Sequence, residues 1–254
     1  MEQRLHNLRF RLHFQPKYRG AAKELTGLEA LLRWHHPELG EMAPSEFIPI
    51  AERSGQILSI GDWVLQAVCD QIACWDAAGM KPVKVALNLS PLQMRSDLVD
   101  SIIKVVSAAG IAPQRLMFEI TETAAMKDVE RTTRVVRELQ SLGFDIAIDD
   151  FGTGYSSLAY LKRFPIDKLK VDRSFVSQLR PHSQDAAIVQ AVIGLGHTLG
   201  IKVIAEGVET VQQREWLKRL SCDEIQGYFY SRPLAEPQLL GFVIGQMRND
   251  AAAA

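Results

Sequence analysis

The chain has 254 residues, which is enough for one large domain or two small ones with a sizeable buried core. Hydrophobic residues make up 47% and charged residues 23% of the chain, which excludes a disordered tail protein. The 29 Lys and Arg residues balance 30 Asp and Glu residues, so the composition argues against a partner that is a nucleic-acid polymer.

Cysteine usage and hydropathy bear on the compartment. Cys69, Cys74 and Cys222 are too few and too scattered for a disulfide framework. No apolar run reaches the ~18 residues of a membrane span, and the first residues lack the apolar stretch of a signal peptide. We therefore expect a cytoplasmic protein, or the cytoplasmic part of a membrane-associated parent, with no membrane contact from this segment. Strand-like sequence already at Phe10 indicates a fragment of a longer chain.

Short apolar runs alternate with stretches of helical period along the whole chain, which favours an α/β fold. The predicted strands are Phe10–Pro16, Gly27–Trp34, Val83–Leu89, Leu116–Ile120, Phe144–Ile148, Lys168–Val171, Lys202–Ala205 and Glu224–Gln226. One helix between them should bury the face formed by Leu98, Ile102, Val105, Val106 and Ala109. Another should bury Ile188, Val192, Leu195 and Leu199. Thr210 and Gln213 have the spacing of a capping box, which predicts a helix start.

Eight strands in about 250 residues, mostly separated by helices, is the count for a β/α barrel. The connection from Lys17 to Thr26 is too short for a crossover helix, which needs at least ~10–12 residues. The sequence therefore predicts a modified TIM-type barrel whose first strand is antiparallel. Because no linker divides the chain, we expect a single domain over residues 1–254 with its core at about 8–242.

Buried parallel strands are usually continuous apolar runs, yet seven of the predicted strands carry polar residues within them or at their carboxyl ends. These residues are Glu29, Asn88, Glu119 with Glu122, Asp149 with Asp150, Lys170 with Asp172, Glu206 and Gln226. Any one of them could be a satisfied structural residue. A barrel gathers its strand ends at one mouth, where active sites lie, so the set as a whole predicts a site there.

Four or five carboxylates that converge would repel one another unless a cation lay among them. Oxygen ligands without Cys or His favour Mg²⁺ or Mn²⁺, and the pair Asp149-Asp150 could serve two ions. Lys170 could orient a water or offset the charge of a phosphate. The loop Gly152-Thr153-Gly154 could meet an anion through its amides or simply connect a strand to a helix. These residues leave metal-assisted hydrolysis and metal-assisted enolate chemistry both open.

The ordered motifs identify a family by resemblance. They are Glu29-Ala30-Leu31, residues 47–52, Asn88-Leu89-Ser90, residues 119–122, 149–158, 169–172, 205–210 and 226–233. Together they closely resemble the EAL domain family of bacterial phosphodiesterases, which hydrolyse cyclic di-GMP. The resemblance covers about Phe10 to Leu240, and the family fold is a barrel with an antiparallel first strand.

Carried over residue by residue, the resemblance implies a metal site and a catalytic set. One divalent ion, Mg²⁺ or Mn²⁺, would be held by Glu29, Asn88, Glu119 and Asp149. A second ion would be held or approached by Asp149 and Asp150. The implied catalytic residues are Glu29, Lys170 and Glu206, with Lys170 at the attacking water or the phosphate. Glu206 would act as the general base or hold a water of the metal site.

The resemblance also implies a substrate site and a supported loop. The implied substrate-binding residues are Gln15, Leu31, Arg33, Asp172 and Gln226. The loop after Asp150 would be anchored by Glu122 and would include Gly152, Thr153 and Gly154, in a segment that the family links to metal binding and dimerisation.

The implied reaction is hydrolysis of cyclic di-GMP to linear 5′-pGpG, through in-line attack of a metal-activated water on one phosphodiester. The implied assembly is a homodimer, with cyclase or sensory domains elsewhere in a longer parent chain. Lys17 stands where the family commonly has an apolar residue, and Met117-Phe118 precede Glu119. We expect neither departure to touch a proposed ligand, and so expect an active enzyme. A catalytically silent cyclic di-GMP receptor and an enolase-type or glycerophosphodiester-hydrolase barrel stay open as alternatives.

Overall fold

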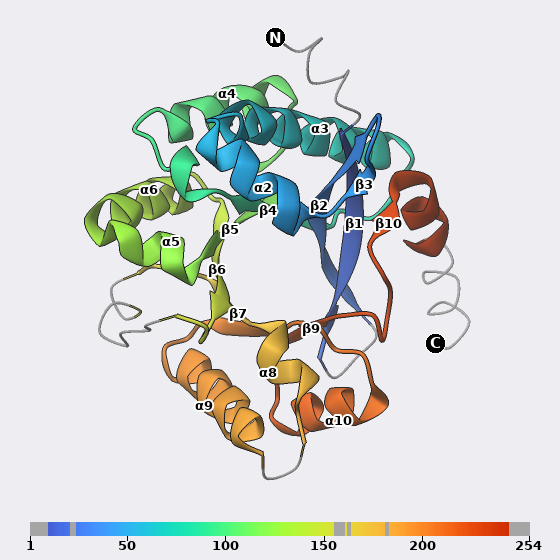
Figure 1. Ribbon diagram of the computed structural model, residues 1–254, viewed down its shortest axis with the longest axis vertical. Helices are drawn as coiled ribbons and strands as arrows, with labels where there is room; N and C mark the ends of the chain where they lie inside the picture. The colour runs from blue at the N-terminus through green and yellow to red at the C-terminus, as the bar shows by residue number, and fades with distance from the viewer. Residues whose placement is uncertain (1–9, 21–23, 155–160, 162–163, 181–182, 244–254) are drawn as a thin grey trace.

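A computed structural model describes residues 10–20, 24–154, 161, 164–180 and 183–243. Eight of the strands in these residues close into a barrel, which confirms the predicted fold (Figure 1). They are β1 (Phe10–Arg19), β2 (Leu25–His36), β4 (Lys84–Leu89), β5 (Leu116–Thr121), β6 (Asp145–Phe151), β7 (Lys168–Val171), β8 (Lys202–Ala205) and β9 (Glu224–Gln226). Each corresponds to a predicted strand, and the largest shift of a boundary is three residues.

The first strand runs opposite to its neighbours, as the short first connection predicts. β1 pairs antiparallel with β2 on one side and with β9 on the other, while β2 and β4 to β9 pair in parallel. Two short strands, β3 (Gly40–Met42) and β10 (Leu234–Ala235), extend the sheet beside β2 and β1. These two were not predicted, because runs of two or three residues are too short to show a period.

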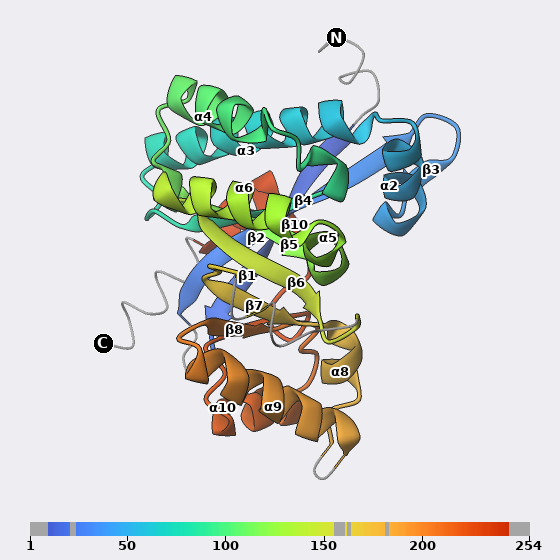
Figure 2. The same cartoon turned by 90° about the vertical axis from the view of Figure 1, so that its left-hand side faces the viewer.

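Helices surround the ring of strands (Figures 1 and 2). They are α2 (Pro44–Arg53), α3 (Ile57–Ala77), α4 (Leu98–Ala108), α5 (Glu122–Lys127), α6 (Val129–Ser141), α8 (Arg173–Ser177), α9 (Gln184–Thr198) and α10 (Val211–Arg219), with 3-10 turns η1 (Pro91–Gln93) and η2 (Pro113–Arg115). Thr210 accepts a hydrogen bond from the Gln213 amide, and the Gln213 side chain accepts from the Thr210 amide, so the predicted capping box begins α10.

Of the helices that the structure describes, α3 alone has the length and apolar composition of a membrane span. Seven of its side chains, including Val68, Ile72 and Trp75, are buried. Its apolar character is therefore explained by packing against the barrel.

The buried face of α4 agrees with the sequence, and that of α9 agrees except at Ile188. Leu98, Ile102 and Val106 are buried on α4. On α9, Val192 is buried and Leu195 and Leu199 pack against the core, whereas Ile188 is 38% exposed. Ala186, Val189, Ile193 and Gly196 are also buried. A Cβ atom at Gly196 would lie 2.4 Å from Val203 Cγ2. The helix therefore approaches β8 closely at Gly196.

The barrel interior is filled in layers. At the amino-terminal ends of the parallel strands lie two ion pairs, Lys84 with Asp145 and Lys168 with Glu224. Above them is a small apolar cluster of Ala86, Met117, Ala147 and Ile204. The polar residues of the strand ends lie above this cluster, while the main hydrophobic core lies between the barrel and the helices.

The ion pair between Lys168 and Glu224 gives a test of the barrel floor. Lys168 Nζ lies 2.7 Å from Glu224 Oε1, and both residues are less than 10% exposed. Lys168→Met leaves a buried carboxylate without its partner, so we expect the free energy of unfolding to fall by about 3 kcal/mol. Adding Glu224→Leu should restore most of that loss in urea denaturation. A double variant as unstable as the single one would show that the pair does not support the floor.

Candidate active site

A β-bulge in β6 sets the arrangement of the pair Asp149-Asp150. Ile148 pairs with Leu169 and Phe151 with Val171, so two residues on β6 stand opposite Lys170 alone on β7. Asp150 takes a left-handed backbone conformation with φ of 54°, which is uncommon for a residue other than glycine. Such bulges and strained residues concentrate at functional sites.

Four carboxylates from four different strand ends converge on the Lys170 ammonium. Lys170 Nζ lies 2.5 Å from Glu119 Oε2, 2.6 Å from Glu206 Oε1, 2.9 Å from Asp149 Oδ2 and 3.6 Å from Glu29 Oε2. The lysine side chain is 1% exposed. The structure thus brings together four of the acids that the sequence singled out, with a cation at their centre.

Amide side chains hold Glu29 from both sides. Gln226 Nε2 donates to Glu29 Oε2 at 2.6 Å, and Asn88 Nδ2 donates to Glu29 Oε1 at 3.0 Å. Gln226 Nε2 also donates to Gln15 Oε1 at 3.0 Å, and Gln15 Nε2 donates to the backbone oxygen of Ser231. The oxygen of Gln226 is buried and accepts no hydrogen bond within the described part of the chain.

Lys17 corrects one expectation. We expected it to touch no proposed ligand, but its Nζ lies 2.5 Å from Glu119 Oε1 across the barrel. Lys17 is 1% exposed. The signal was present in the sequence, since Lys17 and Gln15 are two residues apart on one strand and their side chains therefore share a face. Met117, the other departure, lies in the apolar layer below.

The pKa values in the centre reflect burial and neighbouring charges. Burial acts to raise the pKa of Glu29, but Lys170, Lys17 and the two amide hydrogen bonds outweigh it and hold the pKa at about 2. Burial raises the pKa of Glu119 despite its two lysines. Burial and the neighbouring carboxylates also raise the pKa of Glu206 well above its usual value. Although burial opposes it, the surrounding carboxylates raise the pKa of Lys170 well above normal.

The predicted substrate residues lie around this centre in different environments. Leu31 and Arg33 are partly buried on β2, and the Arg33 guanidinium donates to the backbone oxygen of Leu32. Asp172 accepts a hydrogen bond from the Ser174 amide and so caps the start of α8, which gives this side chain a structural role.

The sequence analysis missed an aromatic residue beyond β9. The Tyr228 ring is 40% exposed, and the guanidinium carbon of Arg232 lies 4.4 Å from its centroid. Arg173 approaches the same ring at 5.8 Å. Tyr228 lies within the family motif at residues 226–233, from which only the polar Gln226 was predicted as a site residue.

The loop after Asp150 is tied to the barrel by Glu122. Glu122 Oε2 accepts a hydrogen bond from the Gly152 amide at 2.9 Å, and a Cβ atom at Gly154 would lie 3.1 Å from Glu122 Oε1. Gly152 has a φ of 99°, a conformation that favours glycine, and Thr153 Oγ1 donates to the Asp150 backbone oxygen. Residues 155–158 of the motif lie outside the described residues.

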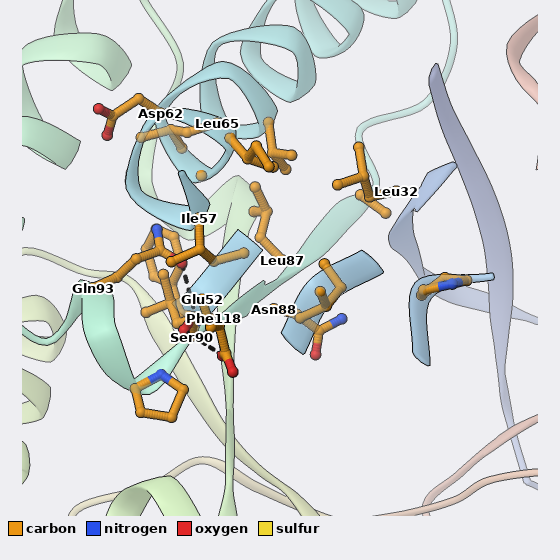
Figure 3. Close-up of a pocket in the computed structure, with 18 of the residues that line it drawn as sticks. Leu32, Glu52, Ile57, Asp62, Leu65, Leu87, Asn88, Ser90, Gln93 and Phe118 are labelled. Atoms are coloured by element: carbon orange, nitrogen blue, oxygen red, sulfur yellow. Dashed lines mark hydrogen bonds between the residues drawn. The ribbon is translucent and has the colours of Figure 1, made fainter. Parts of the chain in front are cut away.

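A cavity of about 440 Å³ lies beside this centre but outside the barrel wall, between β2, β4 and helices α2, α3 and α4 (Figure 3). Ser90 Oγ donates to Glu52 Oε1 at its edge. Asn88 lines the cavity and also bonds Glu29, which joins the two spaces. The lining is mainly apolar and includes Leu32, Ile57, Leu65, Leu87 and Phe118. Because four carboxylates and two ammonium groups meet in the acidic centre, that centre is the candidate for ionic chemistry.

The donor atoms of the centre suit a hard divalent cation. Four carboxylates face two ammonium groups, those of Lys170 and Lys17, which leaves a formal excess of two negative charges. Every candidate ligand offers oxygen, the atom that Mg²⁺ and Mn²⁺ prefer. Among the described residues no three acidic, His or Cys side chains are spaced to hold an ion by themselves. Lys170 lies between the acids, so an ion would have to displace its ammonium.

The fold and the charge of its centre define a class of protein, a β/α barrel whose strand ends gather carboxylates around a cation. The model of the EAL domain family matches residues 1–233. The chain therefore belongs to the EAL domain family.

Two relatives from Pseudomonas aeruginosa align with nearly the whole chain. The bifunctional diguanylate cyclase/cyclic di-GMP phosphodiesterase MucR is 44% identical over 244 residues, which are 96% of this chain and 36% of MucR. The cyclic di-GMP phosphodiesterase NbdA is 42% identical over 253 residues, which are 99% of this chain and 32% of NbdA. The chain thus spans about a third of the length of these relatives.

Solved structures resemble the fold closely. The PaMucR phosphodiesterase in complex with c-di-GMP has a TM-score of 0.89 and 44% identity, covering 94% of this chain and 97% of that one. The FimX EAL domain from Pseudomonas aeruginosa, bound to c-di-GMP, has a TM-score of 0.83 and 26% identity, covering 92% and 94%.

Asp150 provides a test of how far repulsion among the carboxylates of the site lowers the stability of the protein. Burial and the charges of Asp149 and Asp172 raise its pKa from 3.8 to about 6. Stability that the protonated carboxyl provides at acid pH is therefore lost as the pH rises through 6. Without metal, Asp150→Asn should stabilise the protein at pH 8 by about 1 kcal/mol, less than full burial would give because the side chain is partly exposed.

Thermal melts of both proteins in EDTA at pH 4 and pH 8 check this expectation. The gain in Tm should be clear at pH 8 and small at pH 4, because there the carboxyl of Asp150 is protonated in the folded protein and about half protonated in the unfolded chain, whose ordinary pKa is 3.8. Asn also tolerates the left-handed conformation at this position. An equal gain at both pH values would contradict the electrostatic explanation.

Proposed function

We propose that this chain is a metal-dependent phosphodiesterase that hydrolyses cyclic di-GMP to linear 5′-pGpG. The observation that carries the proposal is the convergence of Glu29, Glu119, Asp149 and Glu206 on one buried point at the barrel mouth. Membership of the EAL family supports the reaction, and the two relatives named as cyclic di-GMP phosphodiesterases support the substrate.

The proposed metal ligands are Glu29, Asn88, Glu119 and Asp149, with Asp150 toward a second ion. When bound, Mg²⁺ or Mn²⁺ would neutralise phosphate oxygens and lower the pKa of a water molecule. Gln226 and Asn88 fix both oxygens of Glu29, which orients this carboxylate before any ion arrives. The bulge at Asp149 lets neighbouring residues of one strand both serve the site.

Hydrolysis forms a bond from a water oxygen to phosphorus and breaks the bond from phosphorus to the ribose 3′ oxygen. The water loses a proton, and the departing 3′ oxygen gains one. Glu206 is assigned to receive the proton of the water, because it follows β8 directly and its Oε1 lies 2.6 Å from Lys170 Nζ, beside the other carboxylates of the centre. The Lys170 ammonium stays charged and is assigned to orient the water or the phosphate.

The substrate carries two phosphates and two guanines, so its site needs cationic and amide groups around the acidic centre. Gln15 and Gln226 supply amides at the barrel mouth, and the unpartnered oxygen of Gln226 can accept a hydrogen bond from a base or a water. Arg33 supplies a charge on β2, and Leu31 an apolar contact. We keep Asp172 in this set, although its cap on α8 is a competing role.

The wider setting is also proposed. We infer a cytoplasmic location, because the cysteines that the structure describes are free thiols and the substrate is a nucleotide messenger. We infer a homodimer that assembles near the loop anchored by Glu122. Because the relatives are about three times longer, we infer that this EAL domain works beside cyclase or sensory domains in its parent chain.

The test is an assay of the purified chain with cyclic di-GMP and Mg²⁺ or Mn²⁺, with the product followed by chromatography. We expect pGpG, and we expect EDTA and Glu29→Gln each to abolish it, because both remove the proposed metal site. The matched control is Glu41→Gln on β3, which changes an exposed glutamate that pairs with His35.

Glu41→Gln should keep the wild-type rate. Binding without hydrolysis under both metals would overturn the enzyme and leave a cyclic di-GMP receptor. Absence of binding would overturn both functions and favour another metal-dependent barrel enzyme.

A further inference from the structure

The apolar core is interrupted between the barrel wall and the helices α2 and α3. Ala51, Ile57 and Ile60 form a small buried cluster that is distinct from the main core. The cavity of about 440 Å³ lies at this boundary, because its lining includes Ile57 of the small cluster together with Leu87 of the main core (Figure 3). The reaction proposed above makes no use of this space.

A hydrogen-bonded turn borders the cavity beside β4. Ser90 Oγ donates to Glu52 Oε1 at 2.7 Å, and the Ser90 amide donates to Gln93 Oε1 at 3.0 Å. The Gln93 side chain lies so close to α3 that a Cβ atom at Gly61 would be 2.1 Å from Gln93 Nε2. These contacts tie the turn η1 to both α2 and α3, so this border of the cavity is already formed before any molecule binds.

The lining of the cavity favours neither sign of charge. It includes one cation, Arg33, and two acids, Glu52 and Asp62. The Arg33 guanidinium already donates to the backbone oxygen of Leu32, and the exposed Asp62 carboxylate points away from the other labelled residues (Figure 3). Because most of the remaining lining is apolar, a charged molecule would lose its hydration without gaining a full set of partners. The cavity therefore suits an uncharged molecule.

One hydrogen-bond acceptor remains at the edge of the cavity. Glu52 Oε1 accepts from Ser90, whereas Glu52 Oε2 accepts no hydrogen bond from the residues that the structure describes. An N–H or O–H group of a bound molecule can donate to Oε2. The cavity has about three times the volume of a ~150 Å³ cavity that holds one benzene ring, so it has room for two fused rings.

We propose that this cavity binds a small, uncharged, mainly apolar molecule of about two fused rings, whose N–H or O–H group donates to Glu52 Oε2. The site lies outside the barrel wall, so the inference does not depend on the hydrolysis of cyclic di-GMP. Asn88 borders both spaces, since it lines the cavity and also donates to Glu29. A molecule in the cavity is thereby placed next to a residue of the proposed metal site without entering the barrel mouth.

The experiment measures the binding of indole and benzofuran to the whole chain by isothermal titration calorimetry in EDTA. The two probes have nearly the same shape, but only indole carries an N–H group. We expect indole to bind about tenfold more tightly than benzofuran, as one hydrogen bond to a carboxylate implies. Indole-5-carboxylate, which adds a charge to the same rings, should bind at least tenfold more weakly than indole.

Variants locate the bound molecule. Leu65→Trp fills the cavity from α3 and should weaken indole binding at least tenfold. The matched control is Leu65→Met, which conserves volume and should keep the Kd within twofold of wild type. Ile60→Phe is a second filling variant, in case Leu65→Trp melts early. Glu52→Leu removes the acceptor and should abolish the preference for indole over benzofuran.

Two results would overturn the proposal directly. One is the absence of indole binding to wild type, and the other is equal binding of indole to wild type and to a folded filling variant. Equal affinity of wild type for indole and benzofuran would overturn it as well, because Glu52 Oε2 would then accept no hydrogen bond from the probe.

A last titration separates this site from the proposed substrate site. Cyclic di-GMP is added in EDTA, and the Kd of indole should stay within twofold. A Kd that rises in proportion to the concentration of cyclic di-GMP would overturn the proposal, because the cavity would then belong to the substrate site. If indole binds as expected but no pGpG forms in the metal-loaded assay, the phosphodiesterase falls and this site stands.

Discussion

Repulsion among four carboxylates at one end of the barrel, three of them buried and that of Glu206 partly buried, is the constraint on which the rest of the site depends. Water cannot screen these charges, because Glu119 is 1% and Glu29 is 6% exposed. Two buried lysines, one on β7 and one on the antiparallel β1, offset this repulsion, and amide groups donate hydrogen bonds to both oxygens of Glu29. The two lysines do not cancel the formal charge of the four acids, and the remaining negative charge suits the divalent cation that we propose.

This arrangement sets function against stability. Asp150 adds a strained backbone and a carboxyl with a raised pKa beside the other acids. This arrangement is unfavourable for the groups of the site taken by themselves, so the rest of the fold has to stabilise it. That support comes from the hydrophobic core between barrel and helices, from the ion pairs at the floor, and from Glu122, which fixes the start of the loop at Gly152.

The sequence predicted the barrel, its eight strands and the antiparallel first strand, because apolar runs and one short connection carry that information. It also named the acids that converge on Lys170, since polar residues at the ends of buried strands stand out from their surroundings. Lys17 was misjudged because its spacing from Gln15 shows which face of β1 it shares, but not that its side chain reaches Glu119 across the barrel. On α9 only Ile188 was misplaced, and the close approach at Gly196 was missed because it depends on β8. The bulge at Asp149 depends on pairing with β7, which spacing alone does not reveal.

The central claim is that a divalent ion takes the point where the Lys170 ammonium now meets the carboxylates. The most direct measurement is anomalous diffraction from crystals soaked in Mn²⁺. The account predicts a strong peak contacted by Glu29, Asn88, Glu119 and Asp149, with the Lys170 ammonium moved off Glu119 Oε2. A Lys170 that stays between the four acids, with no peak among them at saturating Mn²⁺, would contradict it.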